Sequence, residues 1–393
     1  MVNEDKIQEI LTRGVERIYP SAEFLRERLL SGEKLLLYLG IDPTGTTLHL
    51  GHIIPLLKLR QFQELGHKVT LLVGDFTATI GDPTDKLAPR VALSAAQVDD
   101  NAKGYGKQAT RILPFTGENP AVLRRNSEWL NKLPMSEMFA LLSNLTYAQI
   151  IKRDMFQERI NQGRDLNVNE LLYPALQGYD SVALNVDGEV GGNDQTFNML
   201  MGRDLLKKLR GKEKFVVAMK LLADSSGKKM GKTEGNMVAL DEKPEEMFGK
   251  IMSWSDTMIA SGFELCTNLP VEKIEEIKRL INPKEQKMEL AYWVTRMLYD
   301  GKHAVEARDN FIKKFSERGV PKETPTIKVT EHQLLIDVVL QEGVVTSKTE
   351  FRRLVGEGAV TILESGEKIT DPASHARAGT YRIGKHRFLK VIV

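Results

Sequence analysis

Residues 35–73 carry the pattern that constrains the fold of this chain most strongly. A short apolar run at 35–39 is followed by a turn-rich loop at 41–47 and then by helically spaced apolar residues that stop at Gly66. A second apolar run follows at 69–73. A strand, a loop, a helix and a strand form a βαβ unit, which is right-handed almost without exception and implies parallel strands. The segment therefore predicts an α/β fold with a parallel sheet.

His49-Leu50-Gly51-His52 stands where this helix begins, at the carboxyl end of the first strand. Unpaired backbone N–H groups and the helix dipole favour phosphate at such a place, and the two histidines would add donors. The same spacing is also typical of a helix start that binds nothing, or of a metal pair. A metal is not expected, because the chain has one cysteine, Cys266, and no third ligand with zinc-like spacing nearby.

A lysine-rich loop at 225–236 is the second informative segment. It reads Ser-Ser-Gly-Lys-Lys-Met-Gly-Lys-Thr-Glu-Gly-Asn, with its lysines flanked by small residues. Such a loop can act as a mobile flap that brings cations to reacting phosphates. Taken alone, a basic loop is more often a solvated surface. The phosphate interpretation of His49 and His52 depends on the presence of this loop.

Together and in this order, the two segments resemble the paired signatures of class I aminoacyl-tRNA synthetases. Other segments resemble the tyrosyl members of bacterial or organellar type, and they lie at 38–44, 173–181 and 191–195. The resemblance covers essentially the whole chain. The distinction from the tryptophanyl members depends chiefly on Tyr38, Tyr173, Gln177 and Asp180. The resemblance implies a Rossmann-like parallel-sheet catalytic domain, followed by a helical domain and a small α+β RNA-binding domain.

The activity implied by the resemblance is that of a tyrosine–tRNA ligase. L-tyrosine would react with ATP, as its Mg²⁺ complex, to give tyrosyl-adenylate and pyrophosphate, and the tyrosyl group would then pass to the 3′ end of tRNA(Tyr). No protein-bound metal is expected. The partners implied are tRNA(Tyr), L-tyrosine, ATP and a second copy of the chain, without a membrane.

The resemblance also assigns site residues. Tyr173, Gln177 and Asp180 fall on one face of a helix by their spacing. The tyrosine-binding residues implied are Tyr38, Asp75, Tyr173, Gln177, Asp180 and Gln195. The ATP-binding residues implied are Asp42, Thr44, His49, Gly51, His52, Gly192, Asp194 and Lys232. The catalytic residues implied are His49, His52, Lys229, Lys232 and Thr233.

Two positions leave alternatives open. Asp75 follows the second strand and either adds charge near the substrate ammonium or caps its own loop. The lysine loop has Gly231 and Thr233 where the usual class I loop has serine. Glycine and threonine also occur there among tyrosyl enzymes, so activity is still expected, while a hydroxyl contact at position 231 is not.

The chain is expected to divide into domains in sequence order. The predicted segments are a catalytic nucleotide- and tyrosine-binding domain at 1–235, a helical tRNA (anticodon) domain at 236–318, a linker at 319–330 and a small RNA-binding domain at 331–393. Within the first, a capping box at Ser94 predicts a helix running toward Leu113. Strands are predicted at 182–186 and 215–219, with a helix at 196–209 between them. Residues 244–316 have a helical pattern.

The C-terminal segment is expected to contact RNA. A helix predicted at 346–355 places cations near one face, and a strand follows from Gly358. The tRNA-binding residues expected are Lys348, Arg352 and Arg353, with further cations at Lys385 and Arg387. A run of charges is usually a solvated face, but this one resembles the small RNA-binding domain that many bacterial tyrosyl enzymes carry.

Composition limits the remaining choices. The net charge of this 393-residue chain is +2, so an RNA-binding surface must be a local patch. One cysteine and the lack of an apolar run of membrane length predict a cytoplasmic protein. Acids at the start of the chain argue against an organelle presequence. The apolar stretch at 130–145 fits either a homodimer interface, as the family implies, or an ordinary core helix.

Two rival classes share part of this pattern. Cytidylyl- and adenylyltransferases carry a similar His-x-Gly-His segment, but they would be shorter and lack the helical and RNA-binding parts. A non-catalytic RNA-binding relative would be expected to lose the lysine loop or the segment at 191–195. Both segments are present.

Overall fold

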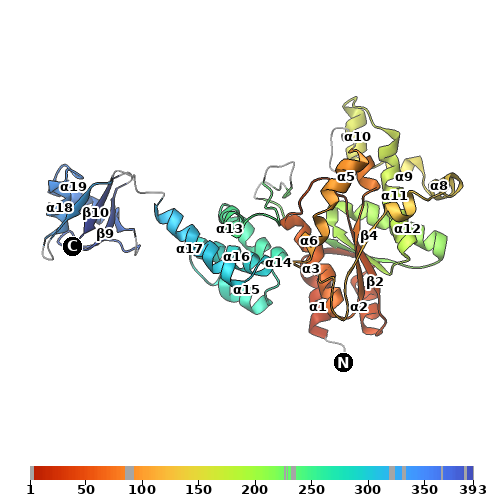
Figure 1. Ribbon diagram of the computed structural model, residues 1–393, viewed down its shortest axis with the longest axis horizontal. Helices are drawn as coiled ribbons and strands as arrows, with labels where there is room; N and C mark the ends of the chain where they lie inside the picture. Colours follow the sequence, from red (N-terminus) through yellow and green to blue (C-terminus); the bar gives the residue numbers. More distant parts are fainter. Residues whose placement is uncertain are drawn as a thin grey trace. The chain divides into compact units, whose positions relative to one another are not determined.

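The computed structural model describes residues 4–84, 93–224, 227, 229–231, 236–317, 324–329, 333–363, 366–384 and 387–392, apart from the side chains of 314–317. The chain forms two compact units, Met1–Val305 and Glu306–Val393. The first holds a large sheet and most of the helices, and the second holds a small sheet with two helices of its own (Figure 1).

A six-stranded sheet forms the centre of the first unit, with the order β1-β6-β5-β2-β3-β4. Its strands are β1 Val15–Tyr19, β2 Leu36–Ile41, β3 Lys68–Val73, β4 Val122–Arg125, β5 Gly188–Gly192 and β6 Phe215–Met219. Strand β1 pairs antiparallel with β6, and the other neighbours are parallel. The expected βαβ unit is confirmed as β2, α3 (Leu50–Glu64) and β3.

The direction of winding changes between β2 and β5. From β2 the chain proceeds outward through β3 and β4, whereas β5 and β6 extend the sheet the other way. In open α/β sheets, ligands bind in the crevice at the carboxyl ends of the strands on either side of such a switch point. The fold alone therefore places a ligand site beyond the ends of β2 and β5.

Helices pack against the sheet and extend from its edges (Figure 1). Besides α3, they are α1 Glu4–Thr12, α2 Ala22–Leu30, α4 Thr77–Ile80, α5 Ala95–Ala102, α6 Tyr105–Ala109, α7 Ser127–Leu130, α8 Met135–Leu142, α9 Tyr147–Ile151, α10 Asp154–Asn161, α11 Val168–Leu184 and α12 Thr196–Arg210. Phe62 of α3 and Phe215 of β6 are both fully buried and stack with their ring centroids 6.0 Å apart.

Two predicted elements differ from the structure. The strand expected at 182–186 is wrong, because α11 continues to Leu184 and ends at Asn185, which has a left-handed backbone conformation. The apolar residues of this run point two ways, because Val182 packs with Leu205 and Leu206 of α12, whereas Leu184 and Val186 pack with Tyr38 and Leu72 of the sheet. The helix predicted from Ser94 toward Leu113 begins with the expected capping box but ends at Ala102, before a separate short helix, α6. The predictions for α12 and β6 are confirmed.

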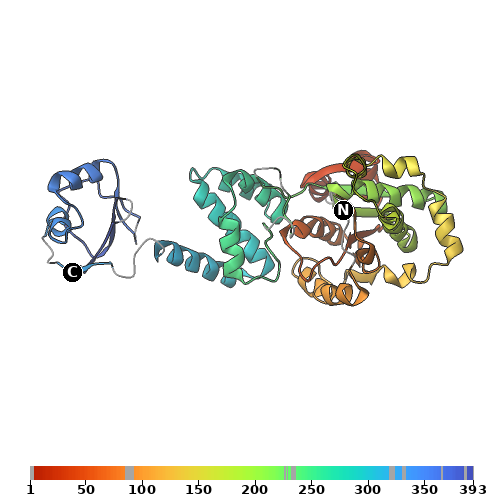
Figure 2. The ribbon, with the colours of Figure 1, turned by 90° about the horizontal axis from the view of Figure 1, so that it is seen from above.

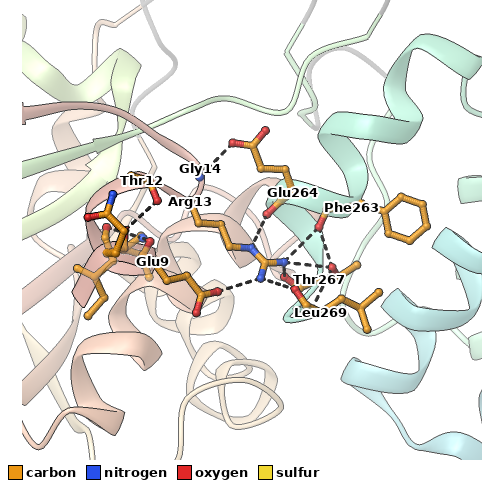
Figure 3. Close-up of polar contacts among 11 residues, drawn as sticks. Glu9, Thr12, Arg13, Gly14, Phe263, Glu264, Thr267 and Leu269 are labelled. Atoms are coloured by element: carbon orange, nitrogen blue, oxygen red, sulfur yellow. Dashed lines mark hydrogen bonds and ion pairs between the residues drawn. The ribbon is translucent and has the colours of Figure 1, made fainter. Parts of the chain in front are cut away.

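A helical segment follows the sheet, as predicted. It consists of α13 Pro244–Met252, η3 Asp256–Met258, α14 Ile259–Cys266, α15 Val271–Lys278, α16 Pro283–Leu298 and α17 Gly301–Glu317. Arg13, between α1 and β1, ties this segment to the start of the chain (Figure 3). Its guanidinium donates to the carbonyls of Glu264 at 3.1 Å, Thr267 at 2.7 Å and Leu269 at 2.6 Å, where α14 ends and its last carbonyls lack helical partners.

The second unit contains a four-stranded sheet with the order β7-β10-β9-β8. Its elements are β7 Thr326–Lys328, α18 Leu335–Gln341, α19 Lys348–Gly356, β8 Val360–Ile362, β9 Gly379–Ile383 and β10 Arg387–Ile392. Both helices lie on the same side of this sheet (Figures 1 and 2), where Phe351, Tyr381 and Leu389 are fully buried. The predicted helix and the strand after Gly358 are confirmed.

The small sheet of the second unit begins earlier in the chain than the predicted RNA-binding domain at 331–393. Strand β7 lies inside the predicted linker 319–330, yet it pairs in parallel with β10, with Thr326 opposite Lys390. The three residues of β7 were too few and too polar to be recognised as a strand from their own pattern. None of the described helices combines the length and hydropathy that are needed to cross a membrane.

Candidate active site

A pocket of about 310 Å³ opens at the carboxyl ends of β2 and β5, where the sheet topology places a ligand site. Its walls come from β2, α3, α11, β5, η1 (Asn193–Gln195) and the lysine loop. The predicted site residues that line it are Tyr38, Asp42, Thr44, His49, Gly51, His52, Tyr173, Gln177, Asp180, Gly192, Asp194, Gln195 and Lys229. Lys232 and Thr233 lie outside the described residues. We call this cavity the site pocket.

One end of the site pocket is suited to a phenol. Tyr38 of β2 and Asp180 of α11 are both buried there. The Asp180 carboxyl accepts hydrogen bonds from Trp129 Nε1 at 2.9 Å and from Asn126 Nδ2 at 3.3 Å, so both of its oxygens are held in place. Burial raises the pKa of Asp180 well above its usual value, against the effect of these two donors. A group with both a donor and an acceptor would fit between Tyr38 and Asp180.

Polar groups gather beside this phenol end in a way that suits an ammonium. The Tyr173 hydroxyl donates to Asp42 Oδ2 at 2.9 Å, and Gln195 Nε2 donates to Asp82 Oδ2 at 2.7 Å. Gln177 Oε1 is buried without a hydrogen-bond partner among the described residues. A buried acceptor in that position is stabilised by a donor brought by a ligand, and a cation supplies the strongest one.

Asp75 lies outside the site pocket. Its carboxylate accepts from the backbone N–H of Ser127 at 2.9 Å and from the Ser127 hydroxyl at 2.7 Å, and it pairs with Arg125 at 3.5 Å. These contacts tie Asp75 to the first residue of α7, so it caps a segment distant in sequence and not its own loop. The carboxylate that the fold brings to the pocket instead is Asp82, in the loop after α4.

The other end of the site pocket is the start of α3. His49 is the N-cap residue, and its Nδ1 accepts from Gly51 N at 3.1 Å, while His52 Nδ1 accepts from His49 N at 3.1 Å. These contacts leave the ring proton on Nε2 of each histidine, where it can be donated to a ligand. A side chain at position 51 would meet the His49 ring, since a Cβ there would lie 2.9 Å from its Cε1.

Both histidines are neutral at pH 7. Burial lowers the pKa of His49 to about 4, with a smaller contribution from the positive charge of Lys229. Burial, and next the charge of His49, lower the pKa of His52 well below its usual value. Their role towards an anion is therefore to donate hydrogen bonds, and the positive charge at this end comes from the lysine loop.

Lys229 brings that charge into the site pocket. Its ammonium lies 2.7 Å from Asp194 Oδ2, and the two residues that follow it anchor the loop. Met230 N donates to Leu222 O at 2.7 Å, and Gly231 N donates to Asn236 Oδ1 at 3.0 Å. Gly231 thus takes part through its backbone, which is consistent with the lack of a hydroxyl at this position.

The predicted tRNA-binding cations lie in the second unit and are exposed. Lys348 pairs with Asp337 at 2.6 Å and Arg353 pairs with Glu357 at 2.7 Å. Arg387 pairs with Glu350 at 2.8 Å, and Lys385 lies outside the described residues. Residues 331–393 contain nine lysines and arginines against eight acids, so this segment is nearly neutral rather than basic.

Several residues that line or support the site pocket were not found from the sequence. Asn126, the N-cap residue of α7, and Trp129 of α7 lie far in sequence from α11, and only the folded chain brings them to Asp180. Asp82 stands in Gly81-Asp82-Pro83-Thr84, an ordinary turn sequence. Among the described residues, no group of three or more His, Cys, Asp or Glu side chains is arranged to hold a metal.

Comparisons with known proteins agree with this geometry. A family model described as tRNA synthetases class I (W and Y) matches residues 30–316. The tyrosine–tRNA ligase of Thermotoga maritima is 38% identical and aligns over 100% of this chain and 98% of its own length. That of Carboxydothermus hydrogenoformans is 41% identical and aligns over 100% of this chain and 99% of its own length.

Solved structures show the same fold. The tyrosyl-tRNA synthetase of Archaeoglobus fulgidus, complexed with L-tyrosine, has a TM-score of 0.60 at 22% identity and covers 78% of this chain and 99% of its own. A C-terminally truncated mitochondrial tyrosyl-tRNA synthetase of Aspergillus nidulans has a TM-score of 0.67 at 21% identity, and the match covers 79% of this chain and 94% of that one. The family model and the full-length relatives go further than the fold, and the chain belongs to the tyrosyl-tRNA synthetases of class I.

Proposed function

We propose that this chain activates L-tyrosine with ATP and transfers the tyrosyl group to the 3′ end of tRNA(Tyr). The observation that carries this proposal is that a single pocket joins a phenol end, at Tyr38 and Asp180, to an anion end, at the start of α3 and Lys229. The two ends match the two substrates that a first, adenylate-forming step must hold together. Enzymes of this family use ATP, and we propose that Mg²⁺ enters with the phosphates of the nucleotide.

The amino acid would lie with its hydroxyl between Tyr38 and Asp180. Its ammonium would meet the unpaired Gln177 Oε1, the Tyr173 hydroxyl and the Asp82 carboxylate. Asp82 takes the role that was considered for Asp75, because it lines the pocket and Asp75 does not. The tyrosine carboxylate would then point toward the α-phosphate.

Adenylate formation needs no protein nucleophile. The tyrosine carboxylate attacks the α-phosphate in line and pyrophosphate leaves, so the protein contributes position and electrostatic stabilisation. His49 and His52 would donate their Nε2 protons to phosphate oxygens, near Gly51 and Thr44. Lys229, Lys232 and Thr233 would contact the leaving pyrophosphate.

Asp194 would exchange partners when ATP binds. Its carboxylate pairs with Lys229 at 2.7 Å, and we propose that the ribose hydroxyls take its place. Lys229 would then be released toward the phosphates. Gly192 would let the ribose approach, since even a Cβ there would lie 2.5 Å from Asp194 Oδ1.

The second step needs tRNA, and we propose that the second unit contacts it through Lys348, Arg352 and Arg353. Arg352 and Arg353 are exposed neighbours on α19. Their charges would act on the RNA phosphates at the surface, without base-specific contacts being required.

The test of the proposed function is tyrosine-dependent exchange between pyrophosphate and ATP, with tryptophan and phenylalanine as alternative substrates. Tyrosine should support exchange far better than either of the others. Charging of a tRNA(Tyr) transcript should then follow in the same preparation. Exchange that depends on tryptophan, or none with any of the three, would contradict the proposal.

We also propose that the protein acts as a homodimer in the cytoplasm. On α8, Leu141 is buried against α11 and α12, whereas Met135 and Phe139 are 69% and 66% exposed. These two lie four residues apart on one face, and Tyr147 on α9 is also 69% exposed. Exposed apolar side chains in such number favour an interface. Light scattering at micromolar concentration should give twice the chain mass, and Phe139→Asp should reduce it to one chain.

A further inference from the structure

A lysine is buried beneath the phenol end of the site pocket. The Lys214 side chain has no solvent exposure and pairs with the Glu189 carboxylate, whose side chain is 3% exposed. Its ammonium also donates to Ser181 Oγ at 2.8 Å, and Ser181 Oγ lies 2.9 Å from the Tyr38 hydroxyl. Buried ion pairs are costly to form, so their contribution to stability alone does not account for one at this position.

The sheet and two helices build this arrangement together. Tyr38 of β2 and Glu189 of β5 are direct partners in the parallel ladder, which places their side chains on the same face of the sheet. Lys214 immediately precedes β6, the next strand. Space for its ammonium comes from Gly202 of α12, where a Cβ would lie 2.9 Å from Lys214 Nζ and 2.6 Å from Ser181 Oγ.

The chemistry of the three groups gives the chain of hydrogen bonds a direction. An ammonium can only donate, so Ser181 Oγ accepts from Lys214. The Ser181 and Tyr38 hydroxyls lie 2.9 Å apart, a contact in which either oxygen can be the donor; because Ser181 Oγ already accepts from Lys214, the arrangement is satisfied when Ser181 donates to Tyr38. Tyr38 then keeps its own proton to donate, and the Glu189 carboxylate beside it and a ligand in the site pocket are the acceptors that compete for it.

We propose that Lys214, held by Glu189, orients the hydroxyls of Ser181 and Tyr38 so that Tyr38 presents a donor to the substrate phenol. This inference rests on the proposed function. Lys214 and Ser181 are positioning residues, because neither lines the site pocket and both act on the ligand through Tyr38, whereas Glu189 lines the pocket beside Tyr38 as well as holding Lys214. Their effect is on the selection of tyrosine over phenylalanine.

The direction of these hydrogen bonds matters because Asp180 would lie on the other side of the substrate phenol from Tyr38. A substrate hydroxyl has one proton to give, and Asp180 accepts it. It must then accept from Tyr38. If Tyr38 instead donated to Ser181, the substrate hydroxyl would face two acceptors with a single proton. Burial and the charges of Glu189 and Asp180 raise the pKa of Tyr38 well above its usual value, so its phenol keeps the proton that this arrangement needs.

The sharpest test is Ser181→Ala in the full-length enzyme, because it removes the link and leaves the buried ion pair intact. The kcat/KM for tyrosine in pyrophosphate exchange should fall roughly tenfold, the value of one hydrogen bond, while that for phenylalanine stays unchanged. Val182→Ala is the matched control, since it truncates a buried neighbour that packs against Leu205 and Leu206. It should lower Tm without changing the tyrosine/phenylalanine ratio.

A double-mutant cycle shows whether the effect passes through Tyr38. In a Tyr38→Phe background, Ser181→Ala should cause no further loss of the ratio, because the group that it orients is gone. Independent, additive effects would overturn the inference. So would an equal loss of kcat/KM for tyrosine and phenylalanine in Ser181→Ala, which is the result expected of a purely structural role.

The charge is tested by a paired substitution. Lys214→Gln with Glu189→Gln removes both charges at similar volume, which avoids the uncompensated buried charge that either change alone would leave. The ratio of kcat/KM for tyrosine to kcat/KM for phenylalanine should fall about as much as in Ser181→Ala. An unchanged ratio would overturn the role of Lys214. If the wild-type enzyme itself showed no tyrosine-dependent exchange, the proposed function would fail instead, and these outcomes are therefore distinguishable.

Discussion

The floor of the site pocket and the surface of the second unit both carry charged side chains, but they hold them differently. At the floor, Lys214 and Glu189 are 0% and 3% exposed and are joined through Ser181 to Tyr38. On the second unit, Lys348 and its partner Asp337 are 51% and 50% exposed. The first pair comes from β5 and the residue immediately before β6, whereas the second lies on the surface of a small helical layer.

This difference decides how each region can act. Buried charges are weakly screened, so a change of one group alters the geometry and energy of its neighbours. Exposed pairs contribute about 0–1 kcal/mol each and are screened by salt. The site pocket should therefore respond strongly to single substitutions, and the second unit should respond mainly to the removal of several cations at once.

The largest expected effect concerns Lys229. Lys229→Ala should lower the rate of adenylate formation by about two to three orders of magnitude, because one charge that faces the leaving pyrophosphate is lost. The Kd for tyrosine should stay almost unchanged, since Lys229 lies at the other end of the pocket. Single-turnover kinetics and equilibrium dialysis measure the two quantities. Lys208→Ala, on the surface of α12, is the control, and equal losses of rate and tyrosine affinity in Lys229→Ala would contradict the assignment.

The next largest effect concerns the phenol end. Asp180→Asn should lower kcat/KM for tyrosine by about 100-fold, because one of the two acceptor oxygens at the phenol end is replaced by an NH₂ donor, and should narrow the ratio of kcat/KM for tyrosine to that for phenylalanine. The remaining amide oxygen can accept from Trp129 or from Asn126 but not from both, because these two donate to different oxygens of Asp180. Exchange assays with both amino acids measure the ratio. A ratio equal to that of the wild type would mean that Asp180 does not contact the phenol.

A smaller effect is expected on stability at low pH. The folded pKa of His49 is about 4, below its ordinary value of 6.5, so the unfolded chain takes up a proton between these values and the folded chain does not. The contribution of neutral His49 to the free energy of unfolding is present above pH 6.5, and about 3 kcal/mol of it is lost as the pH drops to 4. Denaturant titrations from pH 7 to 4 measure this slope.

His49→Asn is the matched variant for that slope. Asparagine is a good N-cap, so it should preserve the start of α3 while removing the titration. The variant should therefore lose less stability than the wild type between pH 6.5 and 4. An identical pH dependence would show that His49 does not contribute.

The smallest expected effect comes from a truncation that removes the sheet of the second unit and leaves the site pocket in place. A chain that ends after Glu317 loses all four strands of the sheet in the second unit, including β7. A chain that ends near Thr330 would instead keep β7 without β10, the strand that it pairs with. Adenylate formation should survive, whereas tRNA charging should weaken by about tenfold and depend less on salt, because Lys348, Arg352 and Arg353 are removed. Charging assays at several salt concentrations test this. Full charging by the truncated protein would leave the second unit without a role in tRNA binding.

Much of the fold could be predicted because the relevant patterns are local. The apolar runs of β2, β3 and β6, the capping box at Ser94 and the helical spacing of α12 depend on residues within a few positions of one another. The errors occurred where local pattern is ambiguous. The apolar run 182–186 fits a buried helix end as well as a strand, and β7 is too short to show an alternation.

The residues of the site also divide into those that a local pattern identifies and those that only tertiary contacts reveal. The residues found from sequence, such as Tyr38, His49 and Asp180, stand in short segments whose spacing resembles a known family. Asp82, Asn126, Trp129 and Lys214 lie in segments without such a signature, and each acts through a partner distant in sequence. Asp75 and Asp82 show the limit clearly, since both follow β3 in loop segments and only one of them reaches the pocket.

By itself, the sequence determined the parallel α/β core, the paired signature segments and the family, because these depend on periodicity and on contiguous residues. The tertiary structure alone decided which carboxylate lines the pocket, which hydroxyls connect Lys214 to Tyr38, and which strand pairs with β10. The physical reason is that these features depend on strand register and on the close packing of α11 against α12. Such contacts join residues that no local pattern connects.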